Sequence, residues 1–494
     1  MKFIVLADLH LPDRADTVKE LVLNWIVDVV KQEQPDYLIG AGDMTASGTI
    51  PASERLIRAL KSTGVPFLLT PGNAELRSPE VAEQVAQILK SIDEKETPFR
   101  MIDTSGGWLM YPEQLQNLPP GAILVTHSPL GCLPQKDREV FAAALEKCDL
   151  LITGHLHKDD VNGKCHIVRG LDPDKAIGGV PALVVFEQKD GNWTRREIPY
   201  IAADPASWTP EERQEFLDHL GLSAMYETMD VIAFATEQKV RCLEIRFQLF
   251  EPSALEEVIW EIRKWRAAGG THLSYHMPDI GWHEGAVSGV ENAMKAAEQV
   301  IAMGCDRVTL HVPLFSVGTS RLENIYQAVL QATAKVAELL VSSGVKVGIE
   351  NMHMTPKEKP DDNRRYGYTT AECLRWINDL RALVSRPELV GYHFDIGHAR
   401  NNAPYSSLEP VSSWLAAMGP DFNGMHLHQI RHNPDGSMEN HTPLLQLYQP
   451  LISLASLFLA WHNGSIRHSP MFLEIRGGTG PESLLTLRRL IGKN

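Results

Sequence analysis

Buried strands alternate with amphipathic helices along roughly the first 160 residues. Residues 2–7 (KFIVLA) and 37–41 (YLIGA) are continuous apolar runs, and residues 18–34 between them show helical spacing. Continuous apolar strands separated by helices are typical of a sheet covered on both faces. Further runs of this kind lie at residues 65–70, 121–126 and 148–153. The pattern therefore predicts an α/β sandwich domain.

The hydrophobic pattern changes after these strands. Residues 165–201 alternate between apolar and polar positions, as antiparallel strands do, with a turn at residues 189–192. A polar stretch follows, in which a threonine, a proline and two acids at positions 209–212 are typical of the first turn of a helix. We therefore expect a first domain over residues 1–203 and a linker over residues 204–217.

A second series of strands and helices begins at about residue 218. The candidate strands are residues 220–226, 241–247, 271–278, 307–313, 346–351, 390–398, 424–429 and 470–477. Eight such strands in roughly 275 residues match the size of a (β/α)8 barrel. We therefore expect a TIM barrel domain over residues 218–494.

Composition narrows the class of protein. The chain has 494 residues and a net charge of −15, so it lacks the excess positive charge by which proteins bind nucleic acid non-specifically. No apolar run has the length of a membrane span, and the N-terminal run lacks a signal-peptide cleavage site. Six scattered cysteines are typical of a reduced protein. We expect a cytoplasmic protein with no membrane partner, and we leave its oligomeric state open.

Polar residues stand where the strands of the first domain end. They are Asp8, His10, Asp43, Asn73, His127, His155 and His157. The carboxyl ends of such strands are where α/β folds place their sites. Two carboxylates, one amide and four histidines are enough ligands for two divalent ions of Mn, Fe or Zn, with Asp43 best placed to bridge them.

The order D-x-H, GD, GN, H and GHxH over about the first 200 residues resembles the calcineurin-like metallophosphoesterase family. The resemblance implies one ion on Asp8, His10 and His157, and a second on Asn73, His127 and His155, with Asp43 between them. The family pattern has a histidine after GN that helps to protonate the leaving oxygen. Here Ala74 stands in its place, followed by Glu75. We expect metal binding to be retained and esters with poor leaving groups to react slowly.

The strand ends of the second domain are also rich in histidines and acids. A barrel brings the carboxyl ends of its strands to one mouth, so residues far apart in the sequence can bind the same ions. The candidates are His272 or His276, with His276 preferred, and His311, Glu350, Asp395, His398, His426, His428, Glu439, His441 and Glu474. These are more ligands than one metal ion needs.

The segments GIEN, FDIGH, MHLH and FLEIRG resemble the skeleton of the xylose-isomerase-like barrel superfamily. Its sugar isomerases and epimerases imply one ion on Glu350, Asp395, His426 and Glu474, with the two glutamates moving a proton. Its endonuclease IV branch implies three zinc ions, with the additional ligands His276, His311, His398, Glu439 and His441. That branch has an asparagine and an aspartate where His428 and Gln429 follow Leu427 here.

These patterns together predict a metalloenzyme of two domains that acts on a phosphorylated small molecule or on nucleic acid. The first hypothesis is phosphoester hydrolysis in both domains, with one to three Zn or Mn ions in the barrel. Its catalytic residues there would be Glu350, Glu474 and His398. A second hypothesis joins a phosphatase to a sugar-phosphate isomerase or epimerase. A third treats the first domain as a binding module that has lost its activity.

Overall fold

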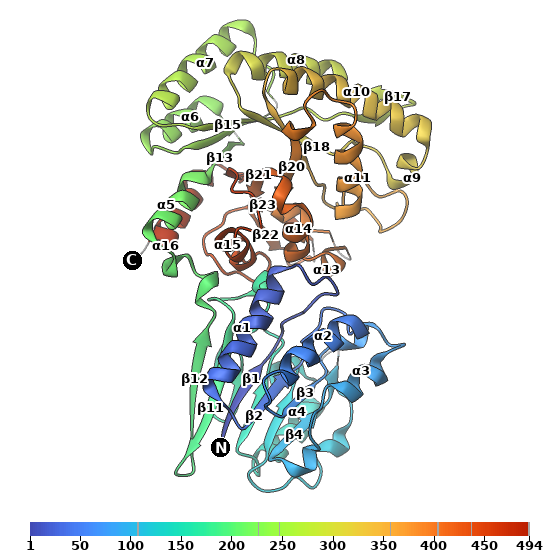
Figure 1. The fold of residues 1–494 in the computed structure, drawn as a ribbon, viewed down its shortest axis with the longest axis vertical. Coiled ribbons are helices and arrows are strands. Elements are labelled where there is room, and N and C mark those ends of the chain that lie inside the picture. The colour runs from blue at the N-terminus through green and yellow to red at the C-terminus, as the bar shows by residue number, and fades with distance from the viewer. Residues whose placement is uncertain are drawn as a thin grey trace. The chain divides into compact units, whose positions relative to one another are not determined.

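The chain folds into two compact units (Figure 1). The computed structural model describes residues 1–105, 108–225, 227–246, 248–355, 357–402, 405–435 and 437–492. The first unit comprises Met1–Asp204 and Tyr448–Leu459, and the second comprises Pro205–Leu447 and Ala460–Asn494.

Two five-stranded sheets form the first unit. In spatial order, one holds β12 (Asn192–Pro199), β11 (Ala182–Lys189), β1 (Lys2–Leu6), β2 (Tyr37–Ala41) and β3 (Phe67–Thr70). The other holds β4 (Phe99–Ile102), β7 (Ile123–Thr126), β8 (Leu150–Thr153), β10 (Cys165–Ile167) and β9 (Asp160–Asn162). Apolar side chains of both sheets, including Phe3, Phe99 and Phe186, form one buried cluster. This arrangement confirms the predicted α/β sandwich.

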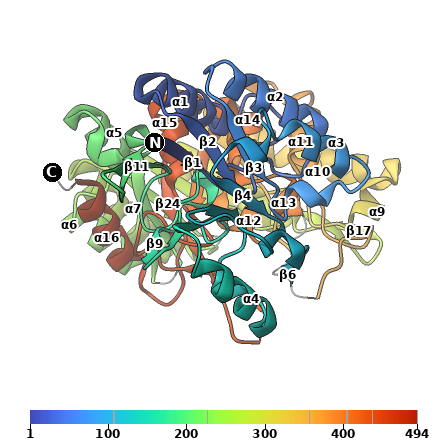
Figure 2. The ribbon, with the colours of Figure 1, turned by 90° about the horizontal axis from the view of Figure 1, so that it is seen from below.

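Helices cover the outer faces of this sandwich. Helices α1 (Val18–Glu33) and α2 (Ile50–Lys61) lie side by side (Figure 2), and α3 (Ala82–Ile88) contacts α2. On the second sheet, α4 (Gln135–Leu145) contributes Phe141 to a cluster with Leu124 and Leu151. The short elements are β5 (Thr104–Ser105), β6 (Trp108–Leu109), η1 (Glu75–Arg77), η2 (Glu94–Glu96), η3 (Pro112–Leu115), η4 (Leu130–Cys132), η5 (Pro173–Lys175) and η6 (Ile201–Ala203).

A segment from late in the chain completes the first unit. Within Tyr448–Leu459, the Ser456 hydroxyl donates to the Asp174 carboxylate at 2.6 Å, and the Tyr448 hydroxyl donates to the Ala203 carbonyl at 3.1 Å. Leu454, Leu457 and other apolar side chains of the segment are buried. The first unit is therefore discontinuous in sequence.

The second unit contains a closed, parallel eight-stranded barrel, which confirms the predicted TIM barrel. Its strands are β13 (Leu220–Ala224), β14 (Cys242–Ile245), β15 (His272–His276), β18 (Arg307–His311), β19 (Lys346–Glu350), β20 (Val390–Asp395), β21 (Phe422–Leu427) and β24 (Met471–Leu473). Two small hairpins extend from it, made by β16 (Gly281–His283) with β17 (Ala286–Ser288) and by β22 (Gln429–His432) with β23 (Met438–Thr442).

Helices follow most barrel strands, as the spacing of the sequence predicts. They are α6 (Thr228–Glu237), α7 (Pro252–Ala267), α8 (Val290–Met303), α9 (Val317–Ser320), α10 (Glu323–Ser342), α11 (Thr370–Arg381), α12 (Ile396–Arg400), α13 (Tyr405–Leu408), α14 (Val411–Met418), α15 (Ala455–His462) and α16 (Gly480–Gly492). Two 3₁₀ turns, η8 (Pro387–Leu389) and η9 (Gly419–Asp421), precede β20 and β21. Among the described residues, no helix combines the length and apolar character needed to cross a membrane.

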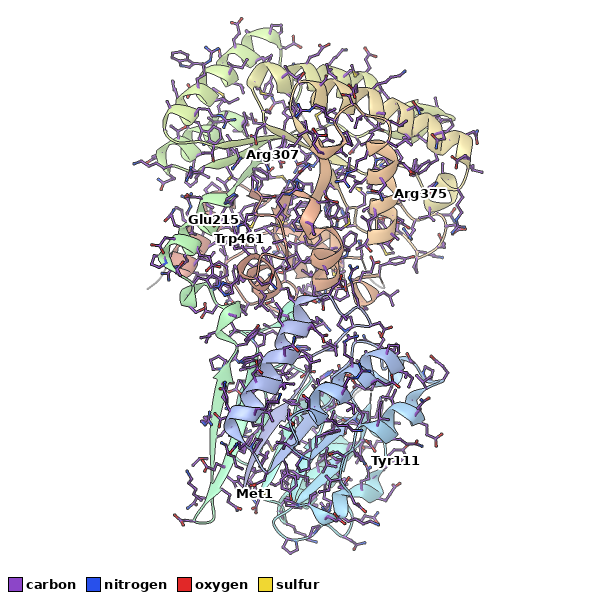
Figure 3. All side chains as sticks on the ribbon, in the orientation of Figure 1. Met1, Tyr111, Glu215, Arg307, Arg375 and Trp461 are labelled. Carbon is purple, nitrogen blue, oxygen red and sulfur yellow. The ribbon has the colours of Figure 1, made fainter. Side chains whose placement is uncertain are left out.

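The stretch expected to be a linker is folded on the second unit. It contains η7 (Pro205–Ser207) and α5 (Pro210–His219), whose N-cap Thr209 accepts a hydrogen bond from the Glu212 amide. Phe216 of α5 packs edge-on against Trp461, and the Glu215 carboxylate bonds to His468 at 2.8 Å. Glu215 and Trp461 are labelled in Figure 3. These residues therefore belong to the body of the barrel unit.

Candidate metal centres

The strand ends of the first unit bring two groups of possible metal ligands together. One group is Asp8, His10 and His157, and the other is Asp43, His127 and His155; within each group the ligand atoms lie within 4.8 Å of one another. These two groups contain six of the seven residues that the sequence singled out in this domain. The seventh, Asn73, places its side-chain oxygen 3.0 Å from His127 Nε2.

Nitrogen atoms face each other in both groups. His10 Nε2 lies 3.4 Å from His157 Nε2, and His155 Nδ1 lies 3.1 Å from His127 Nε2. The Asp43 carboxylate connects the groups, because its Oδ2 lies 3.6 Å from His10 Nε2 and 3.4 Å from His127 Nε2. Two ligand atoms bonded to one zinc ion at about 2.1 Å lie roughly 3.4 Å apart. The spacing therefore suits two ions with Asp43 between them.

Strained backbone conformations coincide with these ligands. Asp8, His10, Asp43, His155 and His157 all have positive φ, between 47° and 72°. Such conformations cost of order 1–3 kcal/mol for residues other than glycine and cluster at functional sites. The site is also crowded at Gly72, because a Cβ atom there would lie 2.2 Å from the Asp43 carboxylate. The packing around the site maintains these backbone conformations although they raise the local conformational energy.

Glu75 explains why the acid after Ala74 is retained. Its buried carboxylate accepts hydrogen bonds from the backbone amides of Asp43 (2.9 Å), Thr45 (2.7 Å) and Gly72 (2.8 Å). The Ala74 amide in turn donates to Asp43 Oδ1 at 2.7 Å. Glu75 thus fixes both loops that carry Asp43 and Asn73, whereas the methyl side chain of Ala74 can neither bind nor donate a proton.

Burial controls the charge of these side chains. Burial raises the pKa of Asp8 to about 8, against the opposing effect of His127. Burial, together with nearby lysines, lowers the pKa of His10 and His157 well below the ordinary value, so both imidazoles are neutral. Neutral imidazoles are the metal-binding form. Lys175 lies at the same site, with its Nζ 3.5 Å from His10 Nε2.

The barrel places a histidine among three carboxylates. His426 Nδ1 lies 3.1 Å from Glu350, 3.3 Å from Glu474 and 3.8 Å from Asp395. All four residues are buried at the carboxyl ends of β19, β20, β21 and β24. The structure therefore brings together the complete one-ion set expected from the sequence.

A second group shares Glu350 with this set. His276 Nε2 and His311 Nε2 each lie 3.3 Å from Glu350 Oε2. His311 is oriented by Asp279, whose carboxylate lies 2.6 Å from His311 Nδ1. His272, the other candidate on β15, begins the strand at the opposite end and lies 3.4 Å from Asp306. His276 is therefore the histidine of this strand that belongs to the centre.

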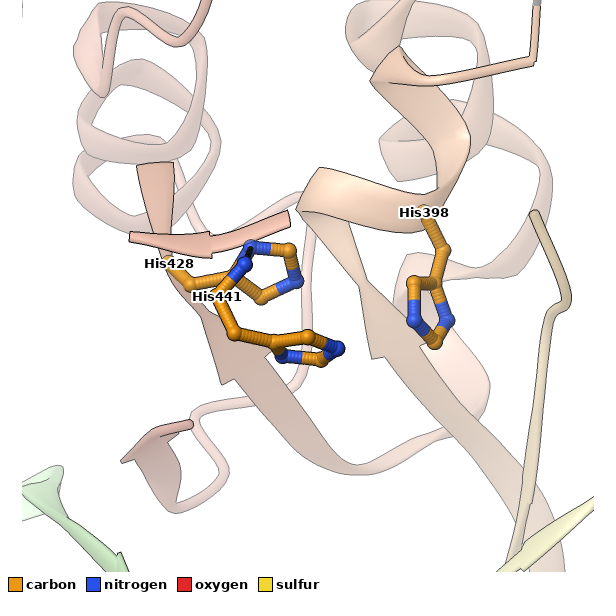
Figure 4. Close-up of side chains that lie close together, drawn as sticks. All are labelled: His398, His428 and His441. Atoms are coloured by element: carbon orange, nitrogen blue, oxygen red, sulfur yellow. Dashed lines mark hydrogen bonds between the residues drawn. The ribbon is translucent and has the colours of Figure 1, made fainter. Parts of the chain in front are cut away.

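Three histidines form a third group: His398, His428 and His441 (Figure 4). His428 Nε2 lies 3.0 Å from Asp395 Oδ1 and thus adjoins the one-ion set. A Cβ atom on Gly397 would lie 1.8 Å from the His428 ring, so the glycine makes room for it.

Glu439 lies apart from this group. Its carboxylate pairs with Arg431, which stands directly opposite it in the β22–β23 hairpin. The hairpin register shifts between Gln429 and Arg431, and His441 has a φ of 60°. This bulge turns His441 toward the centre and leaves Glu439 partly exposed on the hairpin. Glu439, which was expected to be a ligand, thus lies outside this group in the structure, and His428 lies with His398 and His441.

Several of these histidines use Nδ1 to bond to the backbone. His127, His398 and His441 lie 2.9, 3.0 and 3.2 Å from the carbonyl oxygens of Ala41, Asn351 and Glu474. A ligand histidine commonly donates its other ring N–H in this way, which fixes the ring and directs the remaining nitrogen at the metal. Nε2 of these rings is therefore directed at the centres.

Glu244 is a functional residue that the sequence did not reveal. This fully buried acid lies 2.6 Å from His426 Nε2 and accepts hydrogen bonds from Ser223, Ser274 and Thr309. Although burial lowers it, the pKa of His426 rises to about 10 because Glu244 and Glu350 flank the ring. A carboxylate behind a ligand histidine is a common feature of metal sites. In the sequence, the signal that could have identified Glu244 was an acidic residue at the third position of β14.

Polar atoms without hydrogen-bond partners test whether cations fit here. Within the described residues, Asp8 Oδ1, Glu350 Oε2, His398 Nε2 and Glu474 Oε2 are buried and lack such a partner. Unpaired buried acceptors are rare and costly. Carboxylate and imidazole donors aimed at common points suit Zn, Mn or Fe. The side chains present in both units therefore fit divalent metal ions.

The fold and the centres define a chain of two α/β units, each with a buried cluster of metal-ligand side chains. Residues 1–159 match the calcineurin-like phosphoesterase family, and residues 232–463 match the xylose isomerase-like TIM barrel family. Both are enzyme families whose members typically depend on metals. The chain is thus a fusion of these two kinds of domain, as the motifs predict.

Several solved structures are similar to part of this chain. A putative xylose isomerase from Rhodospirillum rubrum is 15% identical, with a TM-score of 0.43, and covers 55% of this chain and 97% of its own. The 3-keto-D-glucoside 4-epimerase of E. coli is 14% identical, with a TM-score of 0.40, and covers 56% and 99%. A dimetal phosphatase from Danio rerio is 13% identical, with a TM-score of 0.31, and covers 40% and 96%. No curated protein matches the chain.

Proposed function

We propose that this protein is a metal-dependent enzyme that acts on phosphorylated substrates, and that its first unit hydrolyses phosphoesters. The observation that supports hydrolysis most directly is the Asp43 carboxylate, within 3.6 Å of His10 and 3.4 Å of His127 and so between two groups of ligands. Two divalent ions bound there would bind a phosphate group and supply a nucleophile for in-line displacement.

The chain's own residues divide the remaining tasks in this unit. Glu75 bonds to the loops that carry Asp43 and Gly72, and so fixes the positions of the ligands on them. The ammonium group of Lys175, 3.5 Å from His10, brings a positive charge to the place where a phosphate would lie. Position 74 offers no proton to the leaving group. Substrates whose leaving groups depart without protonation should therefore react best.

For the barrel we propose hydrolysis as the first candidate. The supporting observation is the surplus of ligands beyond the one-ion set: His276 and His311 at Glu350, and His398, His428 and His441 beside Asp395. Glu350 and Glu474 would hold ions, and His398 directs its unpartnered Nε2 into the same centre. These extra groups are what a site for three ions requires.

Isomerisation or epimerisation of a sugar phosphate is the second candidate for the barrel. It is favoured by the arrangement of Glu350 and Glu474, whose carboxylates lie 3.1 and 3.3 Å from the same atom of His426. Two carboxylates on either side of one ion can take and return a proton beside a carbonyl group. One bound ion in the barrel would support this candidate, and three would support hydrolysis.

The test uses the full chain with each centre disabled separately. Asp43→Asn should reduce turnover of an activated aryl phosphodiester by roughly 10²-fold or more, because a shared ligand is lost. Glu350→Gln should leave that turnover unchanged and remove metal from the barrel. The exposed Glu83→Gln serves as the control. Full turnover in Asp43→Asn with metals still bound would refute hydrolysis by the first unit.

A further inference from the structure

A cavity of about 580 Å³ opens beside the barrel centres. One part of its wall is built from His311, His398, His441 and Glu474, which belong to the centres. Another part is apolar and consists of Leu314, Phe315 and Met352. Pockets of about 300–1,000 Å³ with apolar walls and a few polar groups are typical of small-molecule sites.

Three arginines also line this cavity, and they come from different parts of the chain. Arg246 follows β14, Arg365 lies between β19 and α11, and Arg476 follows β24. Arg246 pairs with Glu474, and Arg365 Nε lies 3.8 Å from Glu358. Arg476 has no ion-pair partner in the described part of the chain. A guanidinium carries five donors in a fork that matches phosphate, so one carboxylate contact leaves donors for a second anion.

Arg365 and Arg476 give this cavity hydrogen-bond donors for an anion. Two carboxylates, Asp279 and Glu474, also line the cavity, and Glu474 already pairs with Arg246. The donors that remain are those of Arg365, which keeps one carboxylate contact at 3.8 Å, and those of Arg476. A phosphate group carries up to two negative charges and accepts paired hydrogen bonds from arginine. The guanidinium groups of Arg365 and Arg476 therefore favour a phosphorylated substrate over a neutral one.

We infer that the barrel takes a phosphorylated small molecule whose phosphate is bound by Arg365 and Arg476. The sugar or base of such a molecule would contact Phe315 and Met352, and its reacting part would face His398 and Glu474. The cavity size and the net charge of −15 both favour a small ligand over a long polyanion. This inference rests on the proposed function, which it narrows to one class of substrate.

Inorganic phosphate is the probe, because every phosphorylated small molecule contains this group. The full chain is loaded with Mn²⁺, and Asp8→Asn with Asp43→Asn removes phosphate binding by the first unit. Calorimetric titration should show that Arg365→Gln and Arg476→Gln each weaken phosphate binding by about tenfold or more. Arg386→Gln is the matched control: Arg386 is similarly exposed and paired, but it precedes β20 at the other end of the strand.

Two results would overturn the inference. One is unchanged phosphate affinity in the double variant Arg365→Gln/Arg476→Gln, with circular dichroism showing that it is folded. The other is a short single-stranded DNA that binds more tightly than a mononucleotide and depends on the same arginines. Phosphoester turnover is measured separately. If phosphoester turnover is present but does not depend on the arginines, the proposed function stands and this inference fails. If phosphate binding depends on the arginines but no turnover is found, this inference stands and the proposed function fails.

Discussion

At the scale of single residues, the loop of residues 72–75 separates metal binding from proton transfer. Asn73 faces His127, Glu75 anchors the backbone of three neighbouring residues, and Ala74 contributes only its amide to Asp43. The loop therefore keeps every contact that positions a ligand. What it lacks is the side chain that would serve a leaving group.

Replacing Glu75 should weaken metal binding in the first unit alone. In Glu75→Gln, an N–H₂ group replaces one of the two carboxylate oxygens that accept hydrogen bonds from backbone amides. The loops that carry Asp43 and Gly72 are then held less firmly. Loss of such an outer partner typically lowers metal affinity about 10–100-fold. Metal titration of the full chain measures this, with Glu83→Gln as control. Unaltered affinity would show that Glu75 does not position the ligands.

Restoring a histidine at position 74 should act selectively. General acid catalysis contributes about 10²–10⁴-fold and matters only for leaving groups that need a proton. Ala74→His should therefore speed hydrolysis of alkyl phosphodiesters far more than that of activated aryl ones. The measurement is kcat/KM across a series of leaving groups for both proteins. An equal change along the series would exclude proton transfer from this position.

At the scale of elements, one buried acid connects several strands inside the barrel. Glu244 on β14 accepts from Ser223 on β13, Ser274 on β15 and Thr309 on β18, and it contacts His426 on β21. Five strands thus share one carboxylate. The pKa of Glu244 lies below its ordinary value, because His426 and the other nearby histidines outweigh the effect of burial.

Removing this carboxylate should destabilise the barrel. Glu244→Ala leaves the hydroxyls of Ser223 and Ser274 and the Nε2 atom of His426 without this acceptor, and breaking a buried charge pair costs about 3–5 kcal/mol. Urea unfolding of the metal-free chain should show this loss in the barrel transition. The exposed Glu257→Ala on α7 is the control. A change below about 1 kcal/mol, which is typical of surface sites, would contradict the role assigned to Glu244.

At the scale of the whole molecule, the two units are compact but not consecutive in sequence. Residues 448–459 fold with the first unit, where Ser456 bonds to Asp174 and Tyr448 bonds to Ala203. Asp174 also pairs with Lys19, a buried lysine of α1. A cut at residue 203 therefore removes part of the first unit as well as the barrel.

A fragment of residues 1–204 should consequently be less stable than the same unit in the full chain. It lacks the hydrogen bonds of Ser456 and Tyr448 and the buried side chains of Leu454 and Leu457. Calorimetry should show a lower melting temperature for the fragment, and Ser456→Ala in the full chain should shift it in the same direction by less. A fragment as stable as the intact unit would show that residues 448–459 contribute nothing.

The sequence by itself determined the strand and helix types, both fold classes and most candidate ligands. The apolar runs fix which segments are buried, and the polar residues directly after them must lie at the carboxyl ends of parallel strands. Asp8, Asp43, His155 and Glu350 could be placed for this reason, because each is tied to its strand by local chain geometry.

Only the tertiary structure decided which side chains meet across strands. Glu244 and His426 are 182 residues apart in the sequence and meet inside the barrel, and Ser456 reaches Asp174 over 282 residues. A bulge in one hairpin sent Glu439 toward Arg431 and His441 toward His428. A shift of one residue in register reverses the face of every side chain that follows, and no local pattern encodes it. The types of the ligand side chains could thus be identified from the sequence, whereas the residues that each ligand contacts depended on the packing of distant segments.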